Sequence, residues 1–189
     1  MDRAAYQSMN AQEGEHWWFV ARRAIIDSLI RNHVPLPAEP RILEAGCGTG
    51  GNLALLAAHG ALDALEYDED ARAIAAARGL ARVEGGALPD RIGFGDTRYD
   101  MIALLDVLEH VDADEASLRA LGARLAEGGR ILLTVPAVPW LWSEHDVLHH
   151  HKRRYTHEQL VAVAQAAGLK VELSGYFNSL LFPLAVAQR

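Results

Sequence analysis

The hydrophobic positions of this chain predict alternating strands and helices. From residue 41 onward, short apolar runs that suit buried strands alternate with longer segments whose apolar residues recur every three or four positions. The expected strands are Arg41–Glu44, Leu62–Tyr67, Ala81–Glu84, Tyr99–Leu105 and Arg130–Val135. The expected helices are Gly51–His59, Glu69–Arg78, Asp112–Ala126 and His157–Ala167. This order predicts an α/β fold with three layers, in which helices cover both faces of a doubly wound, mostly parallel sheet.

Both ends of the chain carry further elements. Glu15–His33 has apolar residues at helical spacing, and three prolines between residues 35 and 40 then end the helix. Near the other end, Thr156 and Gln159 form a capping box, and Gly168 suits a helix C-cap. Lys170–Tyr176 alternates like a sixth strand, and we expect the apolar tail after it to pack as core.

Composition favours a single soluble domain. The chain has 189 residues, half of them hydrophobic, and a net charge of −7, which argues against a dedicated nucleic-acid partner. The one cysteine, Cys47, excludes an internal disulfide framework and suits a reducing compartment, so we expect a cytoplasmic protein. The first twenty residues do not resemble a signal peptide. Leu180–Ala187 is too short to span a bilayer, so we expect no stable membrane insertion.

A glycine turn follows the first expected strand and indicates a nucleotide site. Gly46, Gly48 and Gly50 stand at alternate positions between that strand and a helix. Glycine lets the backbone turn tightly and approach a ligand, and a helix start offers free N–H groups. Gly46, Gly48 and Gly51 also match the G-x-G-x-x-G pattern of NAD-binding domains. However, Glu44 stands two residues before the first glycine, where an acid would repel a pyrophosphate and favour a ligand with a cationic end.

Acidic residues stand at the ends of three expected strands. They are Glu44, Glu66 and Asp106. Ligands of open parallel sheets bind beyond the carboxyl ends of the strands, so these side chains are candidates for binding. Glu66 lies 20 residues after Gly46, where a carboxylate can accept hydrogen bonds from both hydroxyl groups of a ribose.

These motifs together resemble the class I S-adenosylmethionine-dependent methyltransferases. The first motif of that family resembles Glu44-Ala-Gly-Cys-Gly-Thr-Gly, and its ribose-binding acid resembles Glu66-Tyr-Asp. Residues 99–111 resemble the fourth strand and the following helix start, and residues 125–136 resemble the turn into the fifth strand. The likeness is strongest to the bacterial small-molecule branch that carries Leu-Glu-His after strand four. It implies a Rossmann-like methyltransferase fold with an N-terminal capping helix.

The resemblance also implies roles for individual residues. Glu44 would face the methionyl amino group, directly or through water, Glu66 would hold the ribose, and Tyr67 would pack beside the adenine. Relatives often carry an acid at the adenine edge, where this chain has Gly86 and Ala87, so backbone groups of Ala87 or Leu88, or the side chain of Asp90, are expected to substitute. The cofactor set implied by the resemblance is Trp18, Arg22, Glu44, Gly46, Cys47, Gly48, Gly50, Asn52, Glu66, Tyr67, Ala87, Leu88, Asp106 and Val107.

Two of these residues belong to the amino-terminal aromatic block, residues 15–23, in which adjacent aromatic residues precede paired arginines. Trp18 and Arg22 are four residues apart and share one face of the expected helix. In similar methyltransferases such a helix caps the cofactor pocket, and an arginine there suits the carboxylate of methionine because its guanidinium is planar. The alternative is that the aromatic side chains are simply core packing.

Histidines supply the candidate bases. His110 would face the reaction centre, and five of the nine histidines fall within residues 145–157. We expect this segment to bind an acidic or polar acceptor, with His145 or His149 as the base. His145 and His149, like Asp146 and His150, are four residues apart and could pair on a helix face to bind metal. We assign no metal, because no glutamate is placed as in known zinc motifs; a solvated polar loop is the remaining alternative.

The resulting interpretation is a single domain over residues 1–189. Residues 1–34 hold the cap helix, 41–136 the cofactor-binding core, and 137–189 the acceptor-side and C-terminal elements. The predicted activity is O-methylation of a small molecule by in-line displacement from S-adenosylmethionine. The alternatives are a non-catalytic protein that binds this cofactor or S-adenosylhomocysteine, and a small NAD-dependent reductase. A homodimer and a C-terminal truncation stay open, since relatives usually add a seventh strand that is not evident here.

Overall fold

The computed structural model describes residue 14, residues 16–179 and residues 182–187. Within that part of the chain, five strands form one sheet in the order β3-β2-β1-β4-β5, and all neighbouring pairs are parallel. The strands are β1 (Arg41–Ala45), β2 (Ala61–Glu66), β3 (Arg82–Gly85), β4 (Tyr99–Leu105) and β5 (Leu125–Thr134). The prediction of a doubly wound parallel sheet is confirmed.

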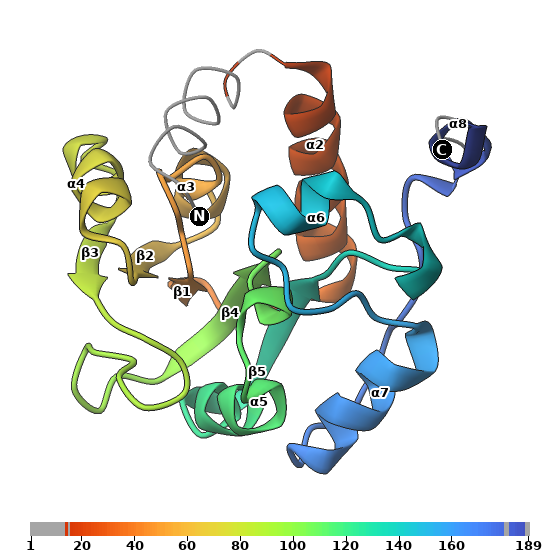
Figure 1. Ribbon diagram of the computed structural model, residues 1–189. Helices are drawn as coiled ribbons and strands as arrows, with labels where there is room; N and C mark the ends of the chain where they lie inside the picture. The colour runs from red at the N-terminus through yellow and green to blue at the C-terminus, as the bar shows by residue number, and fades with distance from the viewer. Residues whose placement is uncertain (1–13, 15, 180–181, 188–189) are drawn as a thin grey trace.

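Helices cover both faces of this sheet (Figure 1). One buried cluster joins the strands to α2 (Trp17–His33), α3 (Leu53–Ala57) and α4 (Glu69–Ala77). The cluster on the opposite face joins them to α5 (Asp114–Gly122) and α7 (His157–Ala166). The remaining elements are η1 (Leu108–His110), η2 (Pro139–Leu141), α6 (Glu144–Leu148) and α8 (Phe182–Ala187).

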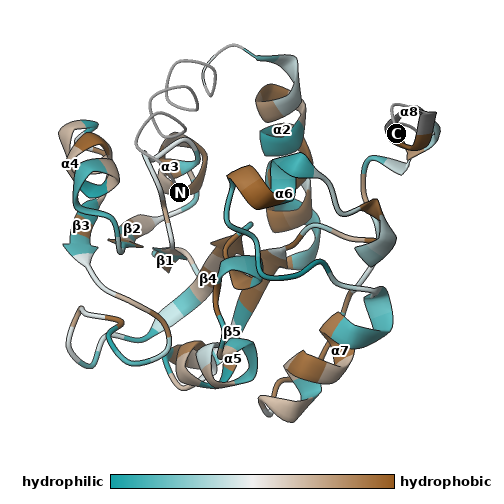
Figure 2. Cartoon of the chain, in the orientation of Figure 1, coloured by the Kyte–Doolittle hydropathy of each residue, from teal (hydrophilic) through white to brown (hydrophobic). Residues whose placement is uncertain are grey.

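The two clusters arise because successive strand residues point to opposite faces. In β1, Ile42 belongs to one cluster and Leu43 to the other. In β4, Met101 and Ala103 face α2–α4, whereas Ile102 faces α5 and α7. Strands buried on both sides are hydrophobic along their length, as the brown strand segments of Figure 2 show.

The largest difference from the predicted elements lies around β5. The helix expected over Asp112–Ala126 ends at Gly122, and the strand expected from Arg130 begins at Leu125. The register of β4 on β5 shifts between Tyr99 and Met101. A Cβ on Gly129 would lie 2.7 Å from the Tyr99 carbonyl oxygen, so glycine allows the close strand approach at this irregularity.

The carboxyl-terminal predictions are partly wrong. The capping box of Thr156 and Gln159 is present, and Gly168 has a φ of +86° just after α7. Lys170–Tyr176 forms no strand in the described structure, because its alternating pattern finds no ladder partner there. Leu180 and Leu181 of the tail lie outside the described residues. Phe182 is 41% exposed in α8, which lies away from the sheet in Figure 1, so this part of the tail is not core.

Candidate active site

The glycine turn after β1 has the backbone conformation that the sequence predicted. Gly46 and Gly48 have φ values of +83° and +55°, a region that residues with a Cβ seldom adopt. A Cβ on Gly46 would lie 2.6 Å from Cγ2 of Val107, so glycine lets the turn pack against the segment after β4. A Cβ on Gly48 would meet nothing within 4 Å, and this residue lines a cavity. The turn therefore leaves room for a ligand beside Gly48.

Glu66, at the end of β2, holds this turn in place. Its Oε2 accepts a hydrogen bond from the Gly48 N–H at 2.8 Å, and its Oε1 accepts one from the Asp68 N–H at 2.9 Å. The residue is only 7% exposed, yet it lines the cavity. A carboxylate has about four acceptor positions, so two remain for the hydroxyl groups of a ligand.

Glu44 does not reach the cavity directly. It is fully buried at the end of β1, and its Oε1 accepts a hydrogen bond from Nδ2 of Asn52 at 3.0 Å. Asn52 lines the cavity, whereas Glu44 is absent from the described lining residues. The acid that sequence analysis placed against the ligand therefore orients an amide that can contact it.

The segment after β3 explains the departure from the family pattern at the adenine edge. A Cβ on Gly86 would lie 2.3 Å from both the Arg91 carbonyl oxygen and Cδ1 of Leu65, so no acid fits there. The Ala87 N–H donates to the Arg91 carbonyl at 2.8 Å. Because the Ala87 amide is used in this turn, Leu88 is the better of the two predicted backbone contacts.

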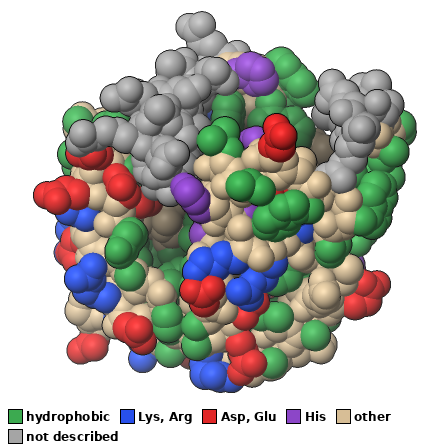
Figure 3. Space-filling view, in the orientation of Figure 1, with side chains coloured by type: hydrophobic (Ala, Val, Ile, Leu, Met, Phe, Trp, Pro, Cys, Tyr) green, Lys and Arg blue, Asp and Glu red, His purple; other side chains and the backbone are tan. Residues whose placement is uncertain are grey.

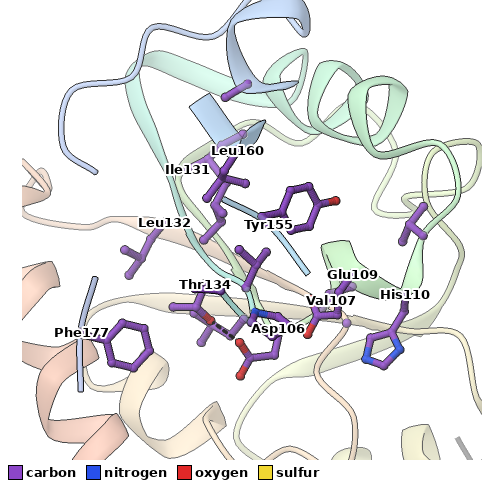
Figure 4. Close-up of a pocket in the computed structure, with 18 of the residues that line it drawn as sticks. Asp106, Val107, Glu109, His110, Ile131, Leu132, Thr134, Tyr155, Leu160 and Phe177 are labelled. Atoms are coloured by element: carbon purple, nitrogen blue, oxygen red, sulfur yellow. Dashed lines mark hydrogen bonds between the residues drawn. The ribbon is translucent and has the colours of Figure 1, made fainter. Parts of the chain in front are cut away.

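Asp106 ends β4 in a constrained conformation. Its φ is +56°, which is uncommon for a residue with a side chain and which recurs at functional sites. The Thr134 hydroxyl donates to its Oδ1 at 2.9 Å, as the dashed line in Figure 4 marks. Arg22 forms an ion pair with Asp106 and donates to Thr134 Oγ1 at 2.8 Å. This network fixes one anion and one cation side by side at the cavity.

Most of the predicted cofactor residues line a single cavity of about 2540 Å³. Its lining includes Trp18, Arg22, Gly46, Cys47, Gly48, Asn52, Glu66, Tyr67, Ala87, Leu88, Asp106 and Val107. Gly50 is not among the described lining residues. A Cβ on Gly50 would lie 2.7 Å from Cδ1 of Leu53, so this glycine serves the packing between the turn and α3.

The helix α2 closes one side of this cavity. Trp18, Phe19 and Arg22 line it, and Arg22 is 8% exposed. Further along the helix, Ile26 packs into the core and anchors α2 to the sheet. Trp17 is 59% exposed, so the aromatic block is not uniformly core. The predicted N-terminal helix is present and lines the cavity.

Four histidines that line the same cavity lie close to one another. His110 comes from η1, His145 and His149 from α6 and its C-cap, and His151 from the loop that follows. The rings of His145 and His149 lie 4.1 Å apart, as their spacing predicted, and His110 and His151 lie 4.8 Å apart. Sequence analysis brought the first pair together and missed His151.

Burial lowers the pKa values of His110, His145 and His149, which favours their neutral form near pH 7. It is the main cause that lowers the pKa of His110 to about 4, with the neighbouring His151 second. Burial also lowers the pKa values of His145 and His149, and the second causes are His151 and His145 respectively. A neutral imidazole can accept a proton or bind a metal through its free nitrogen.

Asp146 organises the loop that carries these histidines. It is fully buried, and its carboxylate receives the Arg154 guanidinium at 2.7 and 2.8 Å and contacts Nδ1 of His151 at 2.9 Å. Burial by itself would raise the pKa of Asp146. The hydrogen bonds from Arg154 and His151 outweigh burial and hold this pKa well below its usual range. Asp146 and His150 do not form the helical pair considered as a metal alternative, because α6 ends at Leu148 and Asp146 contacts His151 and Arg154.

The basic residues after the histidines are already paired. Lys152 pairs with Asp112, Arg153 with Asp114 and Arg154 with Asp146. Figure 3 shows basic and acidic side chains adjoining on this face. An acidic ligand would have to compete with these carboxylates for the three cations.

Glu109 is a feature that sequence analysis did not assign. It is fully buried, and neither carboxylate oxygen has a hydrogen-bond partner among the described residues. Desolvation raises the pKa of this carboxyl well above its usual value, and the negative charge of Asp106 raises it further. Its position directly before His110 in the Leu-Glu-His motif was the available signal. Thr134, which links Arg22 to Asp106, had no comparable signal.

Comparison with known proteins identifies the family. A family model described as a methyltransferase domain matches residues 16–174. No curated protein matches the chain in a sequence search. None of the helices in the described ranges is both long and apolar enough to cross a membrane.

Solved methyltransferases have the same fold. An S-adenosylmethionine-dependent methyltransferase from Mesorhizobium loti is 19% identical, with a TM-score of 0.66 over 85% of this chain and 90% of that chain. The phosphoethanolamine N-methyltransferase 2 of Haemonchus contortus, in complex with S-adenosylmethionine, is 18% identical, with a TM-score of 0.70 over 89% and 41%. YcgJ from Bacillus subtilis is 18% identical, with a TM-score of 0.65 over 78% and 68%. The chain therefore belongs to the methyltransferase-domain family and is an S-adenosylmethionine-dependent methyltransferase.

Proposed function

We propose that this chain methylates a hydroxyl group of a small polar molecule. One observation carries the proposal: the glycine turn and the histidine cluster line the same cavity. At about 2540 Å³ the cavity exceeds the roughly 300–1,000 Å³ of an ordinary small-molecule site. A methyl donor and an acceptor can therefore occupy it together.

The donor end of the cavity suits S-adenosylmethionine. The open space beside Gly48 admits a ligand close to the backbone, and Glu66 has acceptor positions left for ribose hydroxyls. Arg22 and Asp106 offer one cation and one anion at the cavity, which match the carboxylate and ammonium of an amino acid. When bound, this cofactor supplies an electrophilic methyl group on a sulfonium.

The acceptor end supplies the proton acceptor. A hydroxyl oxygen becomes a better nucleophile as it loses its proton, whereas a neutral amine attacks with a free lone pair. His145 is exposed and His149 half-buried; both line the cavity, have lowered pKa values that favour the neutral form, and have rings 4.1 Å apart. The C–O bond forms as the C–S bond breaks, and the hydroxyl proton passes to one of these imidazoles. This arrangement favours O-methylation over N-methylation.

The test is a transfer assay with isotopically labelled methyl donor. The full chain is incubated with labelled S-adenosylmethionine and fractionated cell extract, and the labelled products are identified by mass spectrometry. We expect an O-methylated compound in the small-molecule fraction. Label on nitrogen, or label confined to protein or nucleic acid, would contradict the proposal.

Single variants then test the bases. His145→Ala or His149→Ala is expected to lower kcat by about 100-fold or more, the usual contribution of a general base. His59→Ala is the matched control, since His59 is not among the described residues that line the cavity and contacts Asp27 instead. Unchanged turnover in both cluster variants would exclude them as bases.

A further inference from the structure

Three side chains beside the proposed acceptor end lie close enough to share one ion. Glu109, His110 and His151 each offer a ligand atom, and these atoms all lie within 4.8 Å of one another. Glu109 and His110 come from η1 directly after β4, and Figure 4 shows both beside Asp106. His151 lies in the loop after α6, and His149 and His150 stand between it and the end of the helix. All three ligand residues line the cavity.

Glu109 carries the independent evidence for a ligand. It is fully buried, and both carboxylate oxygens lack a hydrogen-bond partner within the described structure. The guanidinium of Arg22, whose charge acts on Glu109, pairs with Asp106 instead. A buried carboxyl group without a hydrogen-bond partner is costly in either protonation state, and a buried carboxylate charge is normally paired or coordinates a metal. A cation between Glu109 and the two imidazoles would satisfy it.

The two imidazoles are held as metal-binding histidines usually are. Nδ1 of His151 contacts Oδ1 of Asp146 at 2.9 Å, which leaves Nε2 available. The His110 ring is hydrogen-bonded to the backbone of His150, which likewise leaves one nitrogen available. Ligating histidines typically donate their second ring N–H to a carboxylate or a backbone carbonyl, which fixes the ring and its tautomer.

We propose that Glu109, His110 and His151 bind one divalent transition-metal ion, with Asp146 as the positioning residue for His151. Two imidazoles and one carboxylate suit Zn²⁺, Mn²⁺, Fe²⁺ or Co²⁺ better than Mg²⁺ or Ca²⁺, which prefer oxygen ligands. Three protein ligands leave at least one coordination position open. This site differs from the helical pairs that the sequence offered as metal candidates, because it joins η1 to the loop after α6.

The ion would act on the acceptor, and this role rests on the proposed O-methylation. An acceptor hydroxyl in the open position would lose its proton more readily, since a bound cation lowers the pKa of a coordinated oxygen. The rings of His145 and His149 lie 6.2 and 6.0 Å from that of His151, so the released proton has an acceptor nearby. Metal binding itself requires neither the acceptor nor the methyl donor.

The experiment measures metal binding by the full chain alone. Chelator-treated protein is titrated with ZnCl₂ and CoCl₂ by calorimetry, and the cobalt absorption spectrum reports the coordination. We expect one equivalent to bind, and MgCl₂ in large excess to leave the affinity unchanged. Glu109→Gln and His110→Ala are each expected to weaken binding at least tenfold, and Asp146→Asn about 10- to 100-fold. His59→Ala, at a histidine outside the described lining of the cavity, should bind like the wild type.

The outcomes separate this site from the proposed function. Absence of Zn²⁺ and Co²⁺ binding by the wild type, equal competition by Mg²⁺, or binding that Glu109→Gln and His110→Ala leave unchanged would each overturn the metal site. Circular dichroism confirms that each variant is folded before titration. If His110→Ala is unfolded, a Zn²⁺-induced rise in Tm that is present in the wild type and lost in Glu109→Gln supports the site, and an equal rise in both refutes it. Failure of hydroxyl methylation would leave these results unaffected.

Discussion

Replacing Glu66 with glutamine tests the donor site with the smallest possible change. The carboxylate receives the Gly48 N–H at 2.8 Å and the Asp68 N–H at 2.9 Å. Glutamine keeps one oxygen and turns the other into an NH₂ group that cannot accept. One backbone N–H then loses its acceptor, which costs about 1–3 kcal/mol of folding stability. On the ligand side, one ribose hydroxyl also loses its acceptor.

The expected loss of affinity follows from the lost ribose contact. A hydrogen bond to a charged group contributes about 1.5–3 kcal/mol, which corresponds to about 10- to 100-fold in Kd. Titration calorimetry of S-adenosylhomocysteine into the Glu66→Gln variant measures it, with a thermal melt to confirm folding. The matched control is Glu69→Gln, which makes the same charge change at an exposed residue in the first turn of α4. It should change Kd less than twofold.

The reasoning is refuted if folded Glu66→Gln binds S-adenosylhomocysteine as tightly as the wild type does. It is also refuted if Glu69→Gln weakens binding to the same extent, because the effect would then be one of net charge. A variant that melts earlier but binds normally would show that Glu66 supports only the turn. The binding measurement therefore tests the ribose contact of Glu66, and the thermal melt tests its support of the turn at Gly48.

Three further substitutions probe the rest of the site. Gly46→Ala places a Cβ 2.6 Å from Cγ2 of Val107 at a φ of +83°, so we expect a loss of about 1–3 kcal/mol in a thermal melt; an unchanged Tm would contradict the close packing. Trp18→Ala should weaken S-adenosylhomocysteine binding several-fold in calorimetry if α2 caps the donor, and equal affinity would exclude the cap role. Asp146→Ala leaves Arg154 without its buried partner and should cost about 3–5 kcal/mol in urea unfolding, where a loss under 1 kcal/mol would refute the importance of this pair.

Local sequence signals predicted the parts of the site that one segment builds by itself. The turn from Gly46 to Gly50 needs positive φ values at three positions, and the sequence has glycine at each of them. The acid at the end of β2 follows from chain order, because parallel strands bring their carboxyl ends to one edge. The spacing of His145 and His149 placed their rings together on α6.

Contacts between distant segments could not be predicted in the same way. The bridge from Arg22 through Thr134 to Asp106 joins residues from α2, β5 and the end of β4, with no spacing rule to connect them. The pairing of Asp146 with His151 depends on where α6 ends, and helix ends are the least certain feature of a sequence pattern.

The C-terminal prediction failed for a related physical reason. Residues 170–176 alternate like a strand, but a strand also needs a ladder partner, and the described chain gives them none. Alternation reports that a segment fits a half-buried surface. It does not report which surface is available.

The most direct test of the account is a crystal structure of the chain with S-adenosylhomocysteine bound. The account predicts that the ribose hydroxyls lie within hydrogen-bond distance of Glu66 and that the sulfur faces the segment from Asp106 to His110, on the side of the histidine cluster. It would be contradicted by a ribose bound away from Glu66, or by a sulfur atom that faces away from the histidines.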